Sequence, residues 1–167
     1  MTTEQASAYL NGLAERLAAD GCTTYQDNWS GAPVLVGRRA DFRLRWMATK
    51  LHLFTIATAV PVVGISTIAG FTTQSLRYAR EKKGGLPVGL QNGVGVFPVL
   101  VAEQVDPAAL AWAEEKQRND FACMARPVVV DLSTGRTATF RRRNFIGGGY
   151  AGHFIRKGSA YFPELGG

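Results

Sequence analysis

The segment from Leu51 to Phe71 constrains the fold most, because it contains no Asp, Glu, Lys or Arg. A charge-free segment of this length is either a membrane span or a part of the chain buried inside the protein. A Pro61-Val-Val-Gly64 break lies at its centre, and His52, two threonines, Ser66 and Thr67 add polar groups. These features argue against a membrane span. They predict a buried strand from Lys50 to about Val60, a turn, and the start of a helix.

Other elements follow from periodicity and from the residues that start and stop helices and strands. Thr2 and Gln5 are spaced as a capping box, and Asp20-Gly21 is suited to ending the helix that follows. Asp106-Pro107 is suited to opening another helix. The remaining expected elements are a polar loop at 22–32, strands at 33–36, 41–46 and 94–101, helices at 67–83 and 106–119, a loop at 84–93, and a hairpin of 127–132 with 137–142. Pro98 in the strand expected at 94–101 indicates a sheet edge or a bulge.

The order of these elements is α-β-β-β-α-β-α-β-β, with a last short helix or irregular arm after Gly149. A three-strand meander followed by strands separated by helices predicts an α+β domain, in which helices pack on a mixed β-sheet. With 167 residues, 46% of them hydrophobic and 19% charged, the chain has the size and composition of one globular domain. We therefore expect a single domain over 1–167, with 144–167 as a C-terminal arm.

Charge is distributed unevenly along the chain. Three segments, 38–50, 77–83 and 136–157, hold 15 of the 19 Lys and Arg residues but only two acids, Asp41 and Glu81, whereas the rest of the chain is net acidic. The formal net charge is +6. If the segments converge in space, they form a face that attracts polyanions such as nucleic acid, or an acidic protein. The alternative is that each segment is a solvated strand edge or helix end.

The glycines at 147–149 follow three arginines and precede an expected helix. Backbone N–H groups at a helix N-terminus bind anions, and glycine permits close approach. No P-loop or dinucleotide-binding pattern is present, so a phosphate site and a flexible hinge both remain open. The candidate binding residues are Arg38, Arg39, Arg43, Arg45, Arg141, Arg142, Arg143, Gly147, Gly148, Gly149, Arg156 and Lys157.

Over residues 3–101, the order helix, three-strand meander, helix, strand resembles the core of the PD-(D/E)xK nuclease-like fold. In that family an acid near the second strand and an acid-x-Lys on the third hold a divalent metal. Here Asp41 opens the expected second strand and Lys50 stands at the lysine position, but Ala48 stands where the family has Asp or Glu. The resemblance therefore implies a degenerate relative that binds without a working metal site.

Few other residues suggest chemistry. His52 and His153 lack the neighbours that a zinc site needs, and we predict no metal and no cofactor. Cys22 and Cys123 are expected to be reduced thiols, Cys123 in the core, and the N-terminus has no secretory pattern, so the expected location is cytoplasmic.

The leading hypothesis is a soluble binding or interaction module whose basic face captures a polyanion or an acidic partner. A homodimer of this module is one of the forms that we consider. The alternatives are an enzyme acting on a phosphorylated or nucleic-acid substrate, a degenerate nuclease-like domain, and a structural subunit whose arm completes an oligomer. Whether the chain catalyses any reaction is left open.

Overall fold

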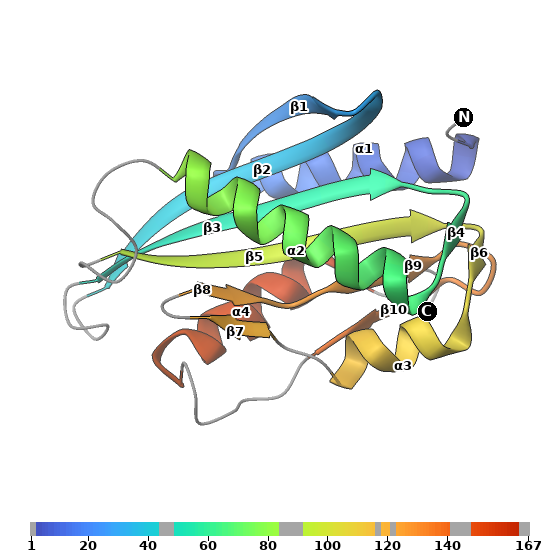
Figure 1. Cartoon of the computed structure of the whole chain (residues 1–167). Helices are drawn as coiled ribbons and strands as arrows, with labels where there is room; N and C mark the ends of the chain where they lie inside the picture. Colours follow the sequence, from blue (N-terminus) through green and yellow to red (C-terminus); the bar gives the residue numbers. More distant parts are fainter. Residues whose placement is uncertain are drawn as a thin grey trace.

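A computed structural model describes residues 3–43, 49–83, 92–115, 118–120, 123–140 and 148–163. It places four helices and a mixed sheet in one α+β domain, in the expected order (Figure 1). The elements are α1 (Glu4–Ala19), β1 (Thr23–Trp29), β2 (Ala32–Arg43), β3 (Thr49–Ala59), β4 (Val62–Val63), α2 (Ile65–Lys82), β5 (Asn92–Ala102), β6 (Gln104–Val105), α3 (Pro107–Glu115), β7 (Arg118–Asp120), β8 (Cys123–Ala125), β9 (Val128–Asp131), β10 (Arg136–Thr139) and α4 (Gly148–Tyr161).

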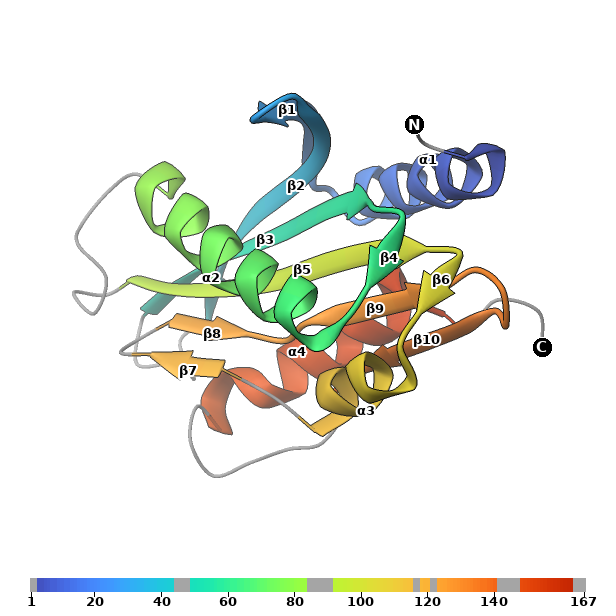
Figure 2. The same ribbon diagram turned by 45° about the vertical axis from the view of Figure 1, so that its right-hand side comes forward.

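The main sheet has eight strands in the described part of the chain. β1, β2 and β3 form an antiparallel meander, and β5 lies parallel to β3. On its other side β5 pairs in parallel with β8 and then with β9, and these carry the antiparallel partners β7 and β10. The short strands β4 and β6 pair with each other just beyond the ends of β3 and β5 (Figure 2).

Helices cover both faces of this sheet. α2 and α3 lie on one face, which we call the front, and α1 and α4 lie on the back (Figure 1). Alternate residues of each strand supply the two cores, because successive side chains point to opposite faces. Phe54 and Ile56 of β3 contribute to the front core with Phe71 of α2, whereas Leu53 contributes to the back core with Leu13 of α1.

The charge-free segment 51–71 is divided as expected into strand β3, a turn and the first part of α2. Leu51 to Thr58 are all buried. α2 begins at Ile65, two residues before the expected start, with Gly64 as its N-cap and a hydrogen bond from the Gly64 N–H to Thr67 Oγ1 (3.2 Å). No helix in the described ranges combines the length and apolar character needed to cross a membrane.

The expected polar loop at 22–32 is wrong, since most of it is strand β1. Ser30 and Gly31, with φ angles of 54° and 90°, make the tight connection to β2. Both positive φ angles match the two-residue turn that joins twisted antiparallel strands. β1 is an edge strand whose side chains are exposed or only half-buried, so its sequence is polar and lacks an apolar strand signal.

The two expected strands at 33–36 and 41–46 are one long strand, β2, as far as the structure describes them. Gly37 lies inside it, paired with Thr55. A Cβ built on Gly37 would lie 2.7 Å from Leu17 Cδ1. Glycine is therefore required here for the close approach of α1, and does not end the strand.

Pro98 was expected at an edge or a bulge, but β5 is a central strand. The pairing of β5 with its neighbour is interrupted between Val96 and Val99, where β8 gives way to β9. The Arg126 N–H bonds to the Val96 carbonyl at this point (2.9 Å). Proline has no N–H to donate, and a broken neighbouring strand accommodates it in the interior of the sheet.

Two helix ends differ from expectation in detail. The N-cap of α1 is Thr3, whose Oγ1 accepts from the Ala6 N–H (3.2 Å), in place of Thr2. α1 ends at Asp20 and Gly21 (φ 84°), as predicted. Asp106 caps α3 through the Ala108 N–H, but α3 ends by Glu115, and 118–120 form β7 instead of helix. The hairpin of β9 and β10 is confirmed.

Candidate functional site

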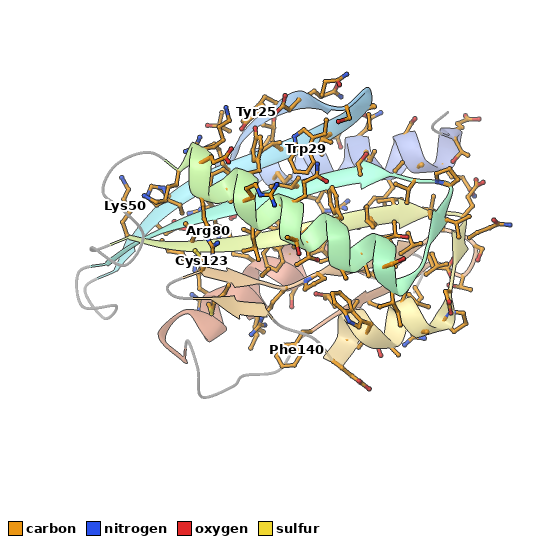
Figure 3. The ribbon with its side chains drawn as sticks, in the orientation of Figure 1. Tyr25, Trp29, Lys50, Arg80, Cys123 and Phe140 are labelled. Carbon is orange, nitrogen blue, oxygen red and sulfur yellow. The ribbon has the colours of Figure 1, made fainter. Side chains whose placement is uncertain are left out.

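Two of the three basic segments meet on the front of the sheet. Arg38, on β2, lies over the ring of Phe54 with its Cζ 4.9 Å from the ring centroid, and its Nη2 donates to the Lys83 carbonyl (3.4 Å) at the end of α2. This contact brings the segment 38–50 against the segment 77–83. Lys50 and Arg80 lie at the same end of the molecule (Figure 3). We call the set Arg38, Lys50, Arg80, Lys82 and Lys83 the basic corner.

The side chains of the basic corner differ in exposure. Lys50, Arg80 and Lys82 are exposed, Arg38 is half-buried, and Lys83 is only 8% exposed. Arg80 Nε donates to Cys123 Sγ (3.2 Å), which anchors that arginine to β8. The thiol of Cys123 is fully buried, as the sequence predicted. At the centre of the corner, Arg38 is therefore held by a hydrogen bond to a backbone carbonyl. At its rim, Lys50, Arg80 and Lys82 are exposed.

Aromatic side chains adjoin the basic corner. Tyr25 and Trp29 of β1, labelled in Figure 3, and Tyr78 of α2 are all half-buried, and we call these three side chains the aromatic shelf. The Tyr25 and Tyr78 hydroxyls are 2.8 Å apart, and the Trp29 ring is tilted against Tyr78 with centroids 5.1 Å apart. Lys82 Nζ lies 5.8 Å from the centre of the Tyr78 ring. The contact of Lys82 with Tyr78 therefore joins the basic corner to the aromatic shelf.

The electrostatics of the shelf keep the Tyr78 phenol neutral. Burial raises the pKa of Tyr78, and its hydrogen bonds with Tyr25 and Asp27 raise it further. The backbone N–H of Asn28 lowers the pKa of Asp27, with help from Tyr78. The shelf therefore presents aromatic rings beside the carboxylate of Asp27.

The part of the third basic segment that belongs to α4, residues 148–157, lies on the back of the sheet (Figure 1). There, Arg39 makes a bidentate contact with Asp41, through Nε (2.9 Å) and Nη2 (2.6 Å), and Nη1 reaches Asp20 (2.8 Å). Lys157 of α4 also binds Asp20 (2.7 Å), and the Tyr161 hydroxyl donates to the same carboxylate. Asp20, Arg39, Asp41, His153, Lys157 and Tyr161 form what we call the back network.

The charged side chains of the back network form ion pairs with one another. Burial opposes the ionisation of both Asp20 and Asp41. For Asp20, the hydrogen bonds from Lys157 and Tyr161 outweigh burial and lower the pKa. For Asp41, the contacts with Arg39 do the same. Burial raises the pKa of Tyr161, and donation to Asp20 raises it further. Arg39 and Lys157, both expected to bind a partner, are therefore paired with carboxylates of their own chain.

The other expected binding residues are dispersed or lie outside the described residues. Arg156 is exposed on α4, and Gly148 and Gly149 are the first two residues of that helix. Arg43 ends β2, without a described side chain. Arg136, which begins the third basic segment but was not an expected binding residue, lies on β10 and forms an ion pair with Glu114 of α3, away from the corner. Arg45, Arg141, Arg142, Arg143 and Gly147 fall outside the described ranges.

Sequence reasoning missed the residues that organise both surfaces. Tyr78 stood in the predicted helix without a role, although its spacing to Lys82 is the i, i+4 spacing of side chains that meet on a helix. Asp20 was interpreted only as the end of α1, and nothing local points to its partners at 39, 157 and 161. Within the described ranges, no group of three His, Cys, Asp or Glu side chains is arranged to hold a metal ion.

Comparisons with protein families, with curated proteins and with solved structures find no match to this chain.

Proposed function

We propose that the chain is a binding module that captures a polyanion at the basic corner. The observation that carries the proposal is the contact of Arg38 with the Lys83 carbonyl, because it brings cations from two distant segments to one end of the sheet. Clustered cations raise the local concentration of polyanions and attract them from a distance. The corner lies at the C-terminus of α2, whose own dipole favours cations there.

The aromatic shelf favours nucleic acid as the polyanion. Bases stack on aromatic side chains while cations contact the backbone phosphates, and this combination is typical of proteins that bind single strands. Tyr25, Trp29 and Tyr78 are partly exposed beside Lys82. An acidic protein would use the cations but has less need of the aromatic rings. Single-stranded nucleic acid is therefore the class that fits both surfaces.

Fluorescence anisotropy with a labelled oligothymidine, measured at several salt concentrations, tests this proposal. We expect the logarithm of the affinity to fall linearly with the logarithm of the salt concentration, with about 0.7 in slope for each phosphate neutralised on a single strand. Lys50→Gln and Lys82→Gln should each weaken binding and make the slope shallower by about that amount. Both side chains are exposed, so the substitutions should leave the fold unchanged.

Arg136→Gln is the matched control, because it removes one positive charge at a site distant from the corner. Its affinity should remain close to that of the unmodified chain. Tyr25→Leu should weaken binding with little change in salt slope, since stacking releases no counterions. Absence of salt-dependent binding would refute the proposal. An equal loss for Arg136→Gln and Lys82→Gln would assign binding to net charge and refute the corner as the site.

A further inference from the structure

A groove on the back of the molecule is separate from the basic corner. It has a volume of about 510 Å³ and lies between α1 and the turn that joins β9 to β10. Gln5, Ala8, Tyr9, Gly12 and Arg16 line it from α1, and Leu132 and Gly135 line it from the turn. We call it the α1 groove. Its walls are mainly small or apolar, with one cation and one phenol.

Arg16 is the cation of this groove, and no carboxylate in the described part of the chain forms an ion pair with it. Its Nε donates to the Tyr161 carbonyl at the end of α4 (2.8 Å), and its guanidinium lies over the Tyr9 ring at 5.5 Å from the centroid. The terminal nitrogens of Arg16 have no hydrogen-bond acceptor among the described residues, and Nη2 is buried. Arg39 and Lys157 on the same back face, in contrast, both bind Asp20.

A half-buried arginine without an anion is costly, because desolvation of its charge is offset only by one carbonyl and one aromatic face. An anion bound in the groove would offset that cost. The guanidinium presents paired donors in one plane, and a carboxylate matches them with its two oxygens. A phosphate dianion would need more than the single cation that lines this groove.

Tyr9 supplies a second polar group. It is only 6% exposed, and its hydroxyl is buried without a hydrogen-bond partner among the described residues. Burial raises the pKa of Tyr9 to about 12, although the nearby charge of Arg16 opposes the rise. The phenol therefore keeps its proton at neutral pH. Small shifts of both side chains would direct its O–H and the Arg16 N–H groups at one acceptor.

We propose that the α1 groove binds a small carboxylic acid with an apolar body, whose carboxylate pairs with Arg16 and accepts a hydrogen bond from Tyr9. The apolar body would lie against Ala8, Gly12 and Leu132. Ligand sites commonly have this composition, with an apolar wall and few polar groups that fix orientation. The site does not depend on the basic corner, and the proposed function could fail without affecting it.

Titration of the ¹⁵N-labelled protein with benzoate tests the proposal, with benzamide as a neutral ligand of the same shape. We expect saturable shifts at residues 5–16 and 132–135 with benzoate, and at least about 10-fold weaker binding of benzamide, the factor that 1.4 kcal/mol of charge-assisted hydrogen bonding represents. Lys82→Gln should bind benzoate as the unmodified chain does, because Lys82 lies in the basic corner.

Two variants attack the groove in different ways. Arg16→Gln removes the cation and should weaken benzoate binding at least about 10-fold, but it also removes the contact with the Tyr161 carbonyl. Ala8→Trp keeps Arg16 and fills the groove from an exposed position on α1, so it should abolish binding in a folded protein. The proposal is overturned if benzoate leaves these resonances unmoved, if benzamide binds equally well, or if Ala8→Trp binds benzoate normally.

Discussion

Asp41 Oδ2 and His153 Nε2 are 3.0 Å apart, and this contact joins β2 to α4 across 112 residues of sequence. His153 is almost completely buried, with 1% of its side chain exposed. Burial lowers its pKa, and Asp41 opposes that shift only in part. At neutral pH the ring is therefore neutral, and its Nε2–H donates to the Asp41 carboxylate.

This arrangement predicts a loss of stability in mild acid. A histidine with a lowered pKa binds its proton more readily in the unfolded chain, so the free energy of unfolding should fall as the pH drops below about 6.5, the ordinary histidine value. The slope contributed by one such group approaches 1.4 kcal/mol per pH unit. Urea titrations between pH 7 and pH 5 measure this dependence.

His153→Gln provides the comparison, because glutamine can donate to Asp41 but does not titrate. Its stability should depend less on pH over the same range, whatever its absolute value. The pKa of His153, measured from its ring resonances, should lie below 6.5. A His153 pKa above that value would contradict the assignment, and so would identical pH slopes in the two proteins.

Asp20 is predicted to hold α4 on the sheet. Its carboxylate binds Arg39, Lys157 and Tyr161, and Asp20→Asn removes the charge that two of these partners require. We expect the free energy of unfolding to fall by about 1–3 kcal/mol, with faster amide hydrogen exchange in α4 before global unfolding. Glu15→Gln, at an exposed position on α1, should change stability by less than about 0.5 kcal/mol. If Asp20→Asn left exchange in α4 unchanged, the network would not be what anchors the helix.

Gly37 and Leu17 are predicted to be energetically coupled. Gly37→Ala places a methyl group 2.7 Å from Leu17 Cδ1 and should cost about 1–3 kcal/mol. In a Leu17→Ala background the same change should cost much less, because the clashing methyl groups are gone. Gly70→Ala is the control: a Cβ there meets nothing within 4 Å, and α2 should gain about 0.5–1 kcal/mol. Thermal unfolding of the four proteins and the control measures these effects, and additive costs at 37 and 17 would disprove the coupling.

The sequence predicted elements well where local signals agree with the tertiary structure. The hairpin of β9 and β10 combines an apolar run with a glycine turn, and Gly135 has the positive φ (75°) that such a turn needs. β1 was missed because an edge strand buries little, so its residues show no core pattern. The strand expected at 33–36 was ended too early, because a glycine that allows a close helix contact, such as Gly37, cannot be told in the sequence from a glycine that ends a strand.

The candidate site was predictable only in part, for a physical reason. Charge counts showed which segments are basic, and Arg38 and Lys82 do lie in the corner. Counts cannot show which cations are matched by acids, because Asp20 meets Lys157 across 137 residues. The same long-range pairing that neutralises the back network leaves the front corner as the candidate surface.

The order in which the chain is synthesised gives the back network a further consequence. Asp20 is made before two of its partners, because Lys157 and Tyr161 follow it by 137 and 141 residues of sequence. Until then the sheet of β1, β2 and β3 can form while its back face remains partly uncovered. A nascent chain that stalls before residue 157 would therefore expose apolar residues such as Phe97 and become a substrate for chaperones.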